Sequence, residues 1–153
     1  ANYLQGAEQN DNNSNQRRLF DTQVVAGPFY DRLTFMVNYD HATEQRALNS
    51  NTSDARWSGT TFYAKYKIND IFEPTLRIED YHDPDGFTTG VPQTLRGYTL
   101  TWNTKIVTSP GTLLMIRPEI RYDQSNADFF TNGSSFRSEK SQFTYGIGAT
   151  LIF

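Results

Sequence analysis

Apolar and polar residues alternate along most of the chain, so that every second side chain belongs to the same face. The pattern is clearest at residues 142–153, where Phe143, Tyr145 and Ile147 share one face with the apolar residues that follow them. Such a period of two is typical of β-strands with one apolar face. It predicts eight strands, at residues 2–9, 18–26, 33–41, 57–68, 72–83, 98–106, 114–123 and 142–153.

The connections between these strands are of two kinds that alternate along the chain. Three are tight, at residues 27–30, 69–70 and 109–111, and four are long and polar, at residues 10–17, 43–55, 84–94 and 124–139. In an up-and-down antiparallel sheet this alternation places every tight turn at one end and every long loop at the other. No boundary divides the chain, and we expect a single domain over residues 1–153.

Composition narrows the class of protein. Apolar residues make up 37% of the 153 residues, whereas aromatic residues reach 14%, which argues against a disordered chain. No run of apolar residues is long enough for a membrane-spanning helix. The chain has no cysteine, which excludes disulfides and thiolate metal sites, and its net charge of −3 gives no electrostatic reason to expect nucleic acid as a partner.

Three features favour a transmembrane β-barrel over a soluble one. The loops are short at one end and long at the other, aromatic residues lie near strand ends, and the alternation continues to the terminal Phe153. In lipid every strand edge must be paired, so we expect the sheet to close into a barrel. The residues predicted to face lipid are Phe35, Phe62, Trp102, Ile116, Ile120, Phe143, Tyr145, Ile147, Leu151 and Phe153.

Three segments resemble those of OmpL-like β-barrel porins of Gram-negative bacteria: residues 76–90, 116–123 and 142–153. The last also resembles the outer-membrane assembly signal, with Gly148, Leu151 and Phe153 at the expected spacing. The resemblance implies a passive pore for small solutes in the bacterial outer membrane, delivered by the assembly machinery that reads the strand ending at Phe153. Members of this family are longer and have more strands, and this chain resembles only their C-terminal part. We therefore expect either a barrel truncated at its N-terminus or one reduced to eight strands.

The polar face supplies the candidate site. We expect the lumen to be lined by Lys65, Arg77, Glu79, Lys105, Arg117, Glu119, Arg121 and Asp123. In a wide barrel these charges would select permeating ions. In a barrel of only eight strands they would instead fill the interior as a network of ion pairs, and this interpretation is the stronger one at that strand number.

Other chemistry is weakly indicated. Asp80, Asp83 and Asp85 offer oxygen ligands for a metal at the start of a loop, although a Pro-Asp-Gly turn explains the same residues. Glu79 and Glu119 lie beside arginines, which oppose the raised pKa that a general acid needs. We expect no catalytic residue and no cofactor.

Three functions remain open at this point. The first is a porin-like channel. The second is a non-conducting barrel that anchors or binds partners through its long loops, with Phe129, Phe130 and Phe136 of loop 124–139 as the contact surface. The third is a soluble barrel that binds a small apolar ligand and turns its apolar face inward. Completion of a larger barrel by several chains is also open.

Overall fold

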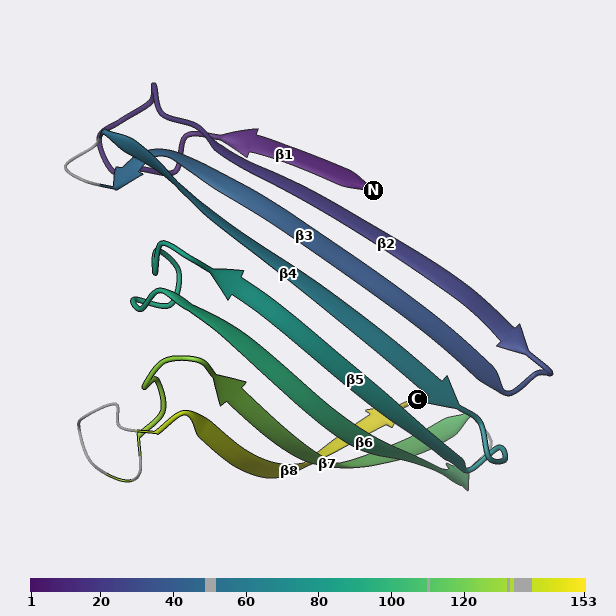
Figure 1. The fold of residues 1–153 in the computed structure, drawn as a ribbon. Coiled ribbons are helices and arrows are strands. Elements are labelled where there is room, and N and C mark those ends of the chain that lie inside the picture. Colours follow the sequence, from purple (N-terminus) through teal and green to yellow (C-terminus); the bar gives the residue numbers. More distant parts are fainter. Residues whose placement is uncertain (49–51, 110, 132, 134–138) are drawn as a thin grey trace.

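The computed structural model describes residues 1–48, 52–109, 111–131, 133 and 139–153. These residues form an eight-stranded sheet in which each strand is antiparallel to its neighbours along the chain (Figure 1). The strands are β1 (Asn2–Gly6), β2 (Arg17–Phe29), β3 (Leu33–Leu48), β4 (Ser53–Tyr66), β5 (Phe72–Asp83), β6 (Gln93–Ser109), β7 (Thr112–Ser125) and β8 (Ser141–Ile152). The described residues contain no helix long and apolar enough to cross a membrane. The predicted up-and-down topology is confirmed.

Most strands are longer than the alternation predicted, chiefly at the end that carries the long loops. β3 continues to Leu48 and β4 begins at Ser53, so most of the predicted loop 43–55 is strand. Here the backbone ladder continues through polar residues, with Thr43 opposite Arg56. β6 likewise begins at Gln93 rather than at residue 98. Alternation of apolar and polar residues predicts only the part of a strand that has one apolar face. The backbone ladder continues beyond that part through polar residues, which is why the strands are longer than predicted.

At the other end the first tight turn lies later than predicted. β2 continues through Gly27 and Pro28 to Phe29, with a register shift between Ala26 and Phe29. Residues 30–32 make the turn, and Tyr30 and Asp31 have positive φ angles of 51° and 56°. β1 is shorter than predicted and ends at Gly6.

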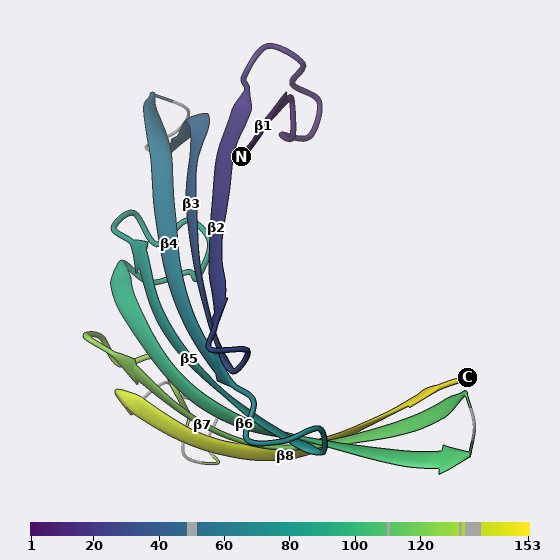
Figure 2. The same cartoon turned by 90° about the vertical axis from the view of Figure 1, so that its right-hand side faces the viewer.

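The sheet is curved but open (Figure 2). β1 pairs only with β2, β8 pairs only with β7, and no backbone ladder joins β1 to β8 in the part of the chain that the structure describes. These eight strands therefore form an open wall, which agrees with the expectation that they are part of a larger barrel rather than a closed barrel of eight. The curvature leaves the two edges apart, and β1 offers only five residues for pairing.

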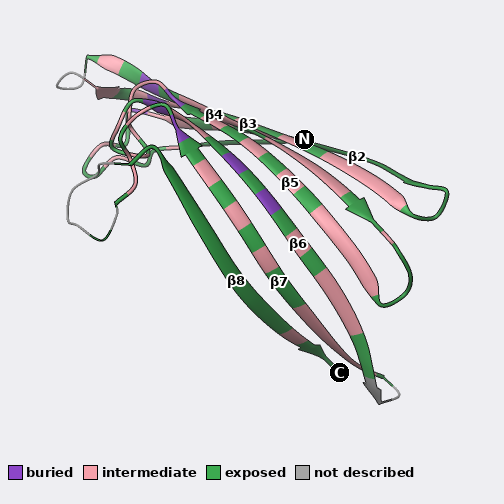
Figure 3. Cartoon of the chain, turned by 60° about the horizontal axis from the view of Figure 1, so that its bottom comes forward, coloured by how far each residue is buried: buried purple, intermediate pink, exposed green. Residues whose placement is uncertain are grey.

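Few positions along the strands are buried (Figure 3), and burial is inverted relative to a soluble protein. Among the described residues, the only buried apolar ones are Ala42 and Ala55, whereas the buried polar ones include Glu44, Asp83 and Thr99. Large apolar side chains of the opposite face are exposed. Side chains on the inner side of a curved sheet crowd together, so the less exposed polar face is the inner one.

Candidate functional site: the inner polar face

All eight residues predicted to line the lumen share the polar face. Residues opposite one another in an antiparallel ladder lie on the same face of the sheet. One register row crosses four strands through Thr61, Glu79, Gly97 and Asp123, and the adjacent row contains Arg77, Thr99 and Arg121. The other predicted lining residues are placed on this face by the same ladders: Lys65, Lys105, Arg117 and Glu119.

An ion-pair cluster holds β5, β6 and β7 together. The Arg121 guanidinium contacts the Asp123 carboxylate, with Nη2 2.6 Å from Oδ1 and Nε donating to Oδ2 at 2.9 Å. Its Nη1 reaches over β6 to Glu79 and also donates to Thr99 Oγ1 at 3.1 Å. Arg77 adds a second cation, its Nε 3.2 Å from Glu79 Oε2. Two carboxylates and two guanidiniums thus balance one another across three strands.

A second, smaller cluster lies nearer the tight turns. The Glu73 carboxylate is 3.7 Å from Lys65 Nζ and 3.5 Å from Lys105 Nζ. Glu73 therefore bridges the lysines of β4 and β6. Its side chain is largely buried and theirs are more exposed, so the contact stabilises the sheet modestly.

Arg117 and Glu119 differ from these clusters because the described residues give neither an ion pair. Arg117 Nη2 donates to Thr150 Oγ1 at 3.2 Å, and Glu119 Oε2 accepts from Thr101 Oγ1 at 2.6 Å. Both line a hollow of about 510 Å³ on the inner face. The wall of this hollow also includes Thr75, Arg77, Thr101, Asn103, Gly146 and Gly148. On this part of the polar face, charged groups without an ion pair in the described chain remain available to a solute.

The residues predicted to face lipid share the opposite face. One row of the ladders runs through Leu76, Leu100, Ile120 and Tyr145, and a second contains Phe62 and Phe143. The same ladders place Phe35, Trp102, Ile116, Ile147 and Leu151 there, and Phe153 follows the end of β8. Tyr145 is 81% exposed and Ile147 is 77% exposed. The outer face is therefore largely apolar over the middle of the sheet and its tight-turn end, whereas the Asp80–Arg96 pair lies on it toward the long loops.

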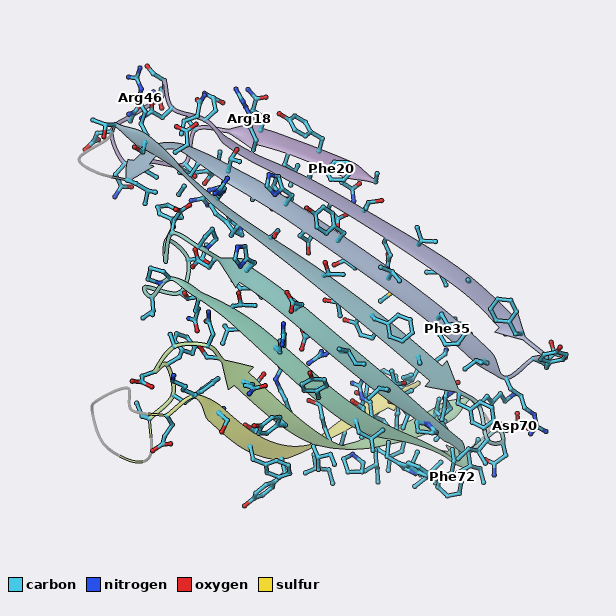
Figure 4. The ribbon with its side chains drawn as sticks, viewed as in Figure 1. Arg18, Phe20, Phe35, Arg46, Asp70 and Phe72 are labelled. Carbon is cyan, nitrogen blue, oxygen red and sulfur yellow. The ribbon has the colours of Figure 1, made fainter. Side chains whose placement is uncertain are left out.

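Aromatic rings cluster on this face toward the tight turns. Phe35 stacks on Phe62 with ring centroids 5.8 Å apart, and Phe72 lies 6.0 Å from Trp102. Figure 4 shows Phe35, Phe72 and the turn residue Asp70 toward the same end of the sheet. Such rings suit the boundary between lipid and water.

One ion pair lies outside the strands, at the turn between β4 and β5. Lys67 Nζ is 2.6 Å from Asp70 Oδ1. The hydrogen bond from Lys67, together with its charge, lowers the pKa of the Asp70 carboxyl below its ordinary value. The same contact raises the pKa of Lys67.

The three aspartates considered as metal ligands do not act together. Asp80 pairs with Arg96, whose Nε is 3.1 Å from Asp80 Oδ2. Asp85 accepts from the backbone N–H of Arg56 at 2.9 Å, and the Asp83 carboxylate is occupied by the loop that follows it. Within the described residues no three His, Cys, Asp or Glu side chains form a group that could hold a metal ion.

Sequence reasoning missed the buried polar layer at the long-loop end of the inner face. Arg17 of β2 pairs with Glu44, and the Glu44 side chain is fully buried. The Arg17 guanidinium also lies 5.7 Å from the centroid of the Trp57 ring. Ser125 Oγ donates to Gln93 Oε1 at 2.7 Å, and both side chains are buried. These residues lie where the apolar alternation fades, so the pattern gave no signal. The one available signal was Asp83 followed closely by the hydroxyls of Thr88 and Thr89.

The aromatic loop considered as a partner surface is described in part. Phe129 and Phe130 pack edge to face with ring centroids 5.3 Å apart, and both backbone N–H groups donate to the carbonyl of Glu139. Phe136 lies outside the described residues.

An antiparallel sheet with apolar side chains outside and ion pairs inside is the arrangement found in the wall of a transmembrane β-barrel. The chain matches, over residues 1–153, the model of the family described as "Putative beta-barrel porin-2, OmpL-like", and it belongs to that family. Searches of curated proteins and of solved structures gave no match. The expected resemblance is thus confirmed over the whole chain. Membership in a porin family implies the outer membrane and favours a non-enzymatic role.

Proposed function

We propose that the chain forms the wall of a porin-like channel for passive diffusion of small solutes or ions across the bacterial outer membrane. The observation that carries this proposal is the inverted burial: the polar face is the covered one, and the large apolar side chains are exposed. Water tolerates such an outer face poorly, whereas lipid stabilises it.

The charged side chains of the inner face are of two kinds: those that pair with one another and stabilise the sheet, and those that a solute would contact. The cluster around Arg121 and the bridge at Glu73 neutralise their own charges, which keeps the strands in register. Arg117 and Glu119 line the hollow without ion-pair partners in the described chain, and a passing ion would meet their charges first. Selectivity then depends on these two residues more than on the paired ones.

The channel needs strands to pair with the two open edges. Unpaired backbone N–H and C=O groups are too costly to leave in hydrocarbon, so β1 and β8 have to gain partners in the bilayer. Those partners are either further barrel strands of the same polypeptide or strands of a second copy. Assembly in the outer membrane through the strand that ends at Phe153 is part of the same proposal.

The two other functions are less well supported. A soluble barrel with a small apolar ligand requires Phe35, Ile116 and Ile147 to point inward, whereas the ladders place them on the face opposite the buried polar residues. A non-conducting barrel that binds partners through its loops is compatible with the sheet. It differs from the proposed channel in a single measurable property, conductance.

The test is single-channel recording after the chain is refolded into planar bilayers. A band shift between unheated and heated samples on a gel verifies folding, and the mass of the unheated species reports how many copies complete the barrel. We expect steady conductance steps that scale with salt. A folded, heat-modifiable species that carries no current would overturn a channel formed by copies of this chain, and would leave the loop-binding barrel or part of a longer barrel.

A further inference from the structure

The loop between β5 and β6, residues 84–92, folds toward the inner side of the sheet. The evidence is an aromatic contact: the Phe87 ring stacks on Trp57 with centroids 5.5 Å apart and planes 24° apart. Trp57 belongs to the inner face, because it is opposite the buried Ala42. The loop that leaves β5 therefore turns across β4 over the polar face instead of standing away from it.

Asp83 fixes the loop in this position. Its Oδ2 accepts four hydrogen bonds, from the backbone N–H groups and the hydroxyls of Thr88 and Thr89, at 2.8–3.0 Å. Its Oδ1 accepts from the backbone N–H of Phe87 at 3.0 Å. The carboxylate is fully buried, so these bonds are shielded from competing water. One side chain thus sets the path of three consecutive loop residues.

Further contacts tie the loop to its neighbours. Asp85 Oδ2 accepts from the N–H of Arg56 on β4, and Tyr81 Oη lies 2.6 Å from Thr88 Oγ1. The loop also closes tightly on itself at Gly86, where φ is +65° and a Cβ would stand 2.7 Å from Pro92 N. The guanidinium of Arg17 lies against the other partner of the stack, Trp57. Contacts from three strands therefore support the stacked pair.

We propose that this loop is a fixed constriction of the solute path, in which Phe87 stacked on Trp57 narrows the long-loop mouth of the pore and Asp83 holds Phe87 in place. The inference rests on the proposed channel function and adds to it the residues that set the size limit. Phe87 and Trp57 present ring faces and edges to the path, while Asp83 is a positioning residue that is itself covered by the loop.

Thiol modification tests the position of Phe87. The chain contains no cysteine, so Phe87→Cys carries a single thiol that can be modified with a trimethylammonium methanethiosulfonate during a recording. We expect modification to reduce the conductance of each open channel. Tyr30→Cys is the control, because Tyr30 is 97% exposed at the turn between β2 and β3, at the opposite end of the sheet. Its modification should leave conductance unchanged.

Asp83→Asn tests the anchoring role. The amide keeps the shape of the side chain, but in either orientation its NH₂ group faces a donor: the Phe87 N–H on one side or the Thr88 and Thr89 donors on the other. The loop should therefore lose its fixed position. Asp85→Asn is the matched control, because Asp85 accepts one hydrogen bond, from the N–H of Arg56 on β4, and an amide oxygen can accept the same bond. In liposome swelling assays with glucose, sucrose and raffinose, we expect Asp83→Asn to admit the larger sugars faster relative to glucose, and Asp85→Asn to match the wild type.

The outcomes separate the two proposals. A wild-type chain that folds and does not conduct overturns the channel and the constriction together. A conducting wild type in which modification at position 87 changes nothing overturns the constriction alone. An unchanged sugar cut-off in folded Asp83→Asn removes Asp83 from its positioning role.

Discussion

Gly97 on β6 lies directly beneath the Arg121 guanidinium of β7. A Cβ built on Gly97 would stand 2.7 Å from Arg121 Nη2, 3.0 Å from Glu79 Oε2 and 3.1 Å from Asp123 Oδ1. Two carboxylates from β5 and β7 and the arginine that joins them therefore meet in the space left by a missing side chain. The absence of a Cβ in the middle strand is what allows Arg121 to reach across it.

Gly97→Ala should disturb this cluster. The three crowded atoms are ends of side chains and can yield, so the expected loss of unfolding free energy is about 1 kcal/mol, at the low end for overpacking. Urea unfolding of the refolded protein measures it. Gly146→Ala is the control, since a Cβ there meets no atom within 4 Å. Equal effects of the two substitutions would show that the cluster does not depend on the space at Gly97.

Removal of the Arg121 charge should cost more than removal of the Arg117 charge. Arg121→Gln leaves Glu79 and Asp123 as neighbouring anions on the half-buried inner face, and we expect a loss of about 2 kcal/mol in the same unfolding measurement. Arg117→Gln breaks a single hydrogen bond to Thr150 and should change stability by less than about 0.5 kcal/mol. The reverse order would contradict the assignment of Arg121 as the residue that joins the strands.

Arg117 should instead affect ion selectivity. Arg117→Glu places a second carboxylate beside Glu119 in the hollow, so cations should be favoured over anions. The reversal potential measured across a salt gradient should move toward the potassium equilibrium potential. Arg96→Glu provides a charge-matched control, because Arg96 pairs with Asp80 and lies on the outer face beside it. A shift of equal size in both variants would remove Arg117 from the solute path.

The outer face can be tested with a single misplaced charge. Ile147 lies in the middle of β8 and is 77% exposed, so Ile147→Lys should cost about 2–4 kcal/mol of folding free energy in lipid vesicles. Gly146→Lys is its neighbour at the same depth on the inner face, opposite Glu119, and should cost less than about 1 kcal/mol. If both lysines are tolerated equally, the apolar face does not meet lipid.

The turn between β4 and β5 gives a pH-dependent prediction. Because Lys67 lowers the pKa of Asp70 in the folded chain, the pair stabilises the fold above the ordinary aspartate pKa. This contribution disappears as pH falls through the lowered value. In Lys67→Gln the Asp70 midpoint should rise to its ordinary value, as followed by carbon NMR in micelles. A midpoint that stays low would indicate another cause, and 1 M salt should weaken the effect because both groups are exposed to solvent.

The strands and their faces could be predicted wherever apolar and polar residues alternate with a period of two. The strand at residues 72–83 was predicted with its correct bounds, and the alternation assigned Arg77, Glu79 and Arg121 to one face before the ladders did. Alternation carries no information about how far a sheet curves, so closure could not be deduced. The contact that Arg121 makes with Glu79 over Gly97 could not be predicted either, because it depends on the register of β5, β6 and β7.

The loop-end contacts were unpredictable for a different reason. The Asp83 carboxylate binds residues four to six positions later, and Trp57 contacts Phe87 thirty positions away. Neither relationship has a period, and the sequence alone suggested only a turn at Pro84 and Gly86. Whether the loop that follows Asp83 buries its carboxylate depends on the conformation of that loop, which the residue pattern does not predict.

The open edge of β8 makes this strand hazardous outside the bilayer. Residues 141–153 contain no charged side chain. Phe143, Tyr145 and Ile147 are exposed beside backbone groups for which the described residues offer no partner strand on that side. High β-propensity, low charge and an unpaired edge are the ingredients of cross-β aggregation. The edge that a closing strand must pair with in the bilayer is thus also the edge along which unprotected chains would stack in water.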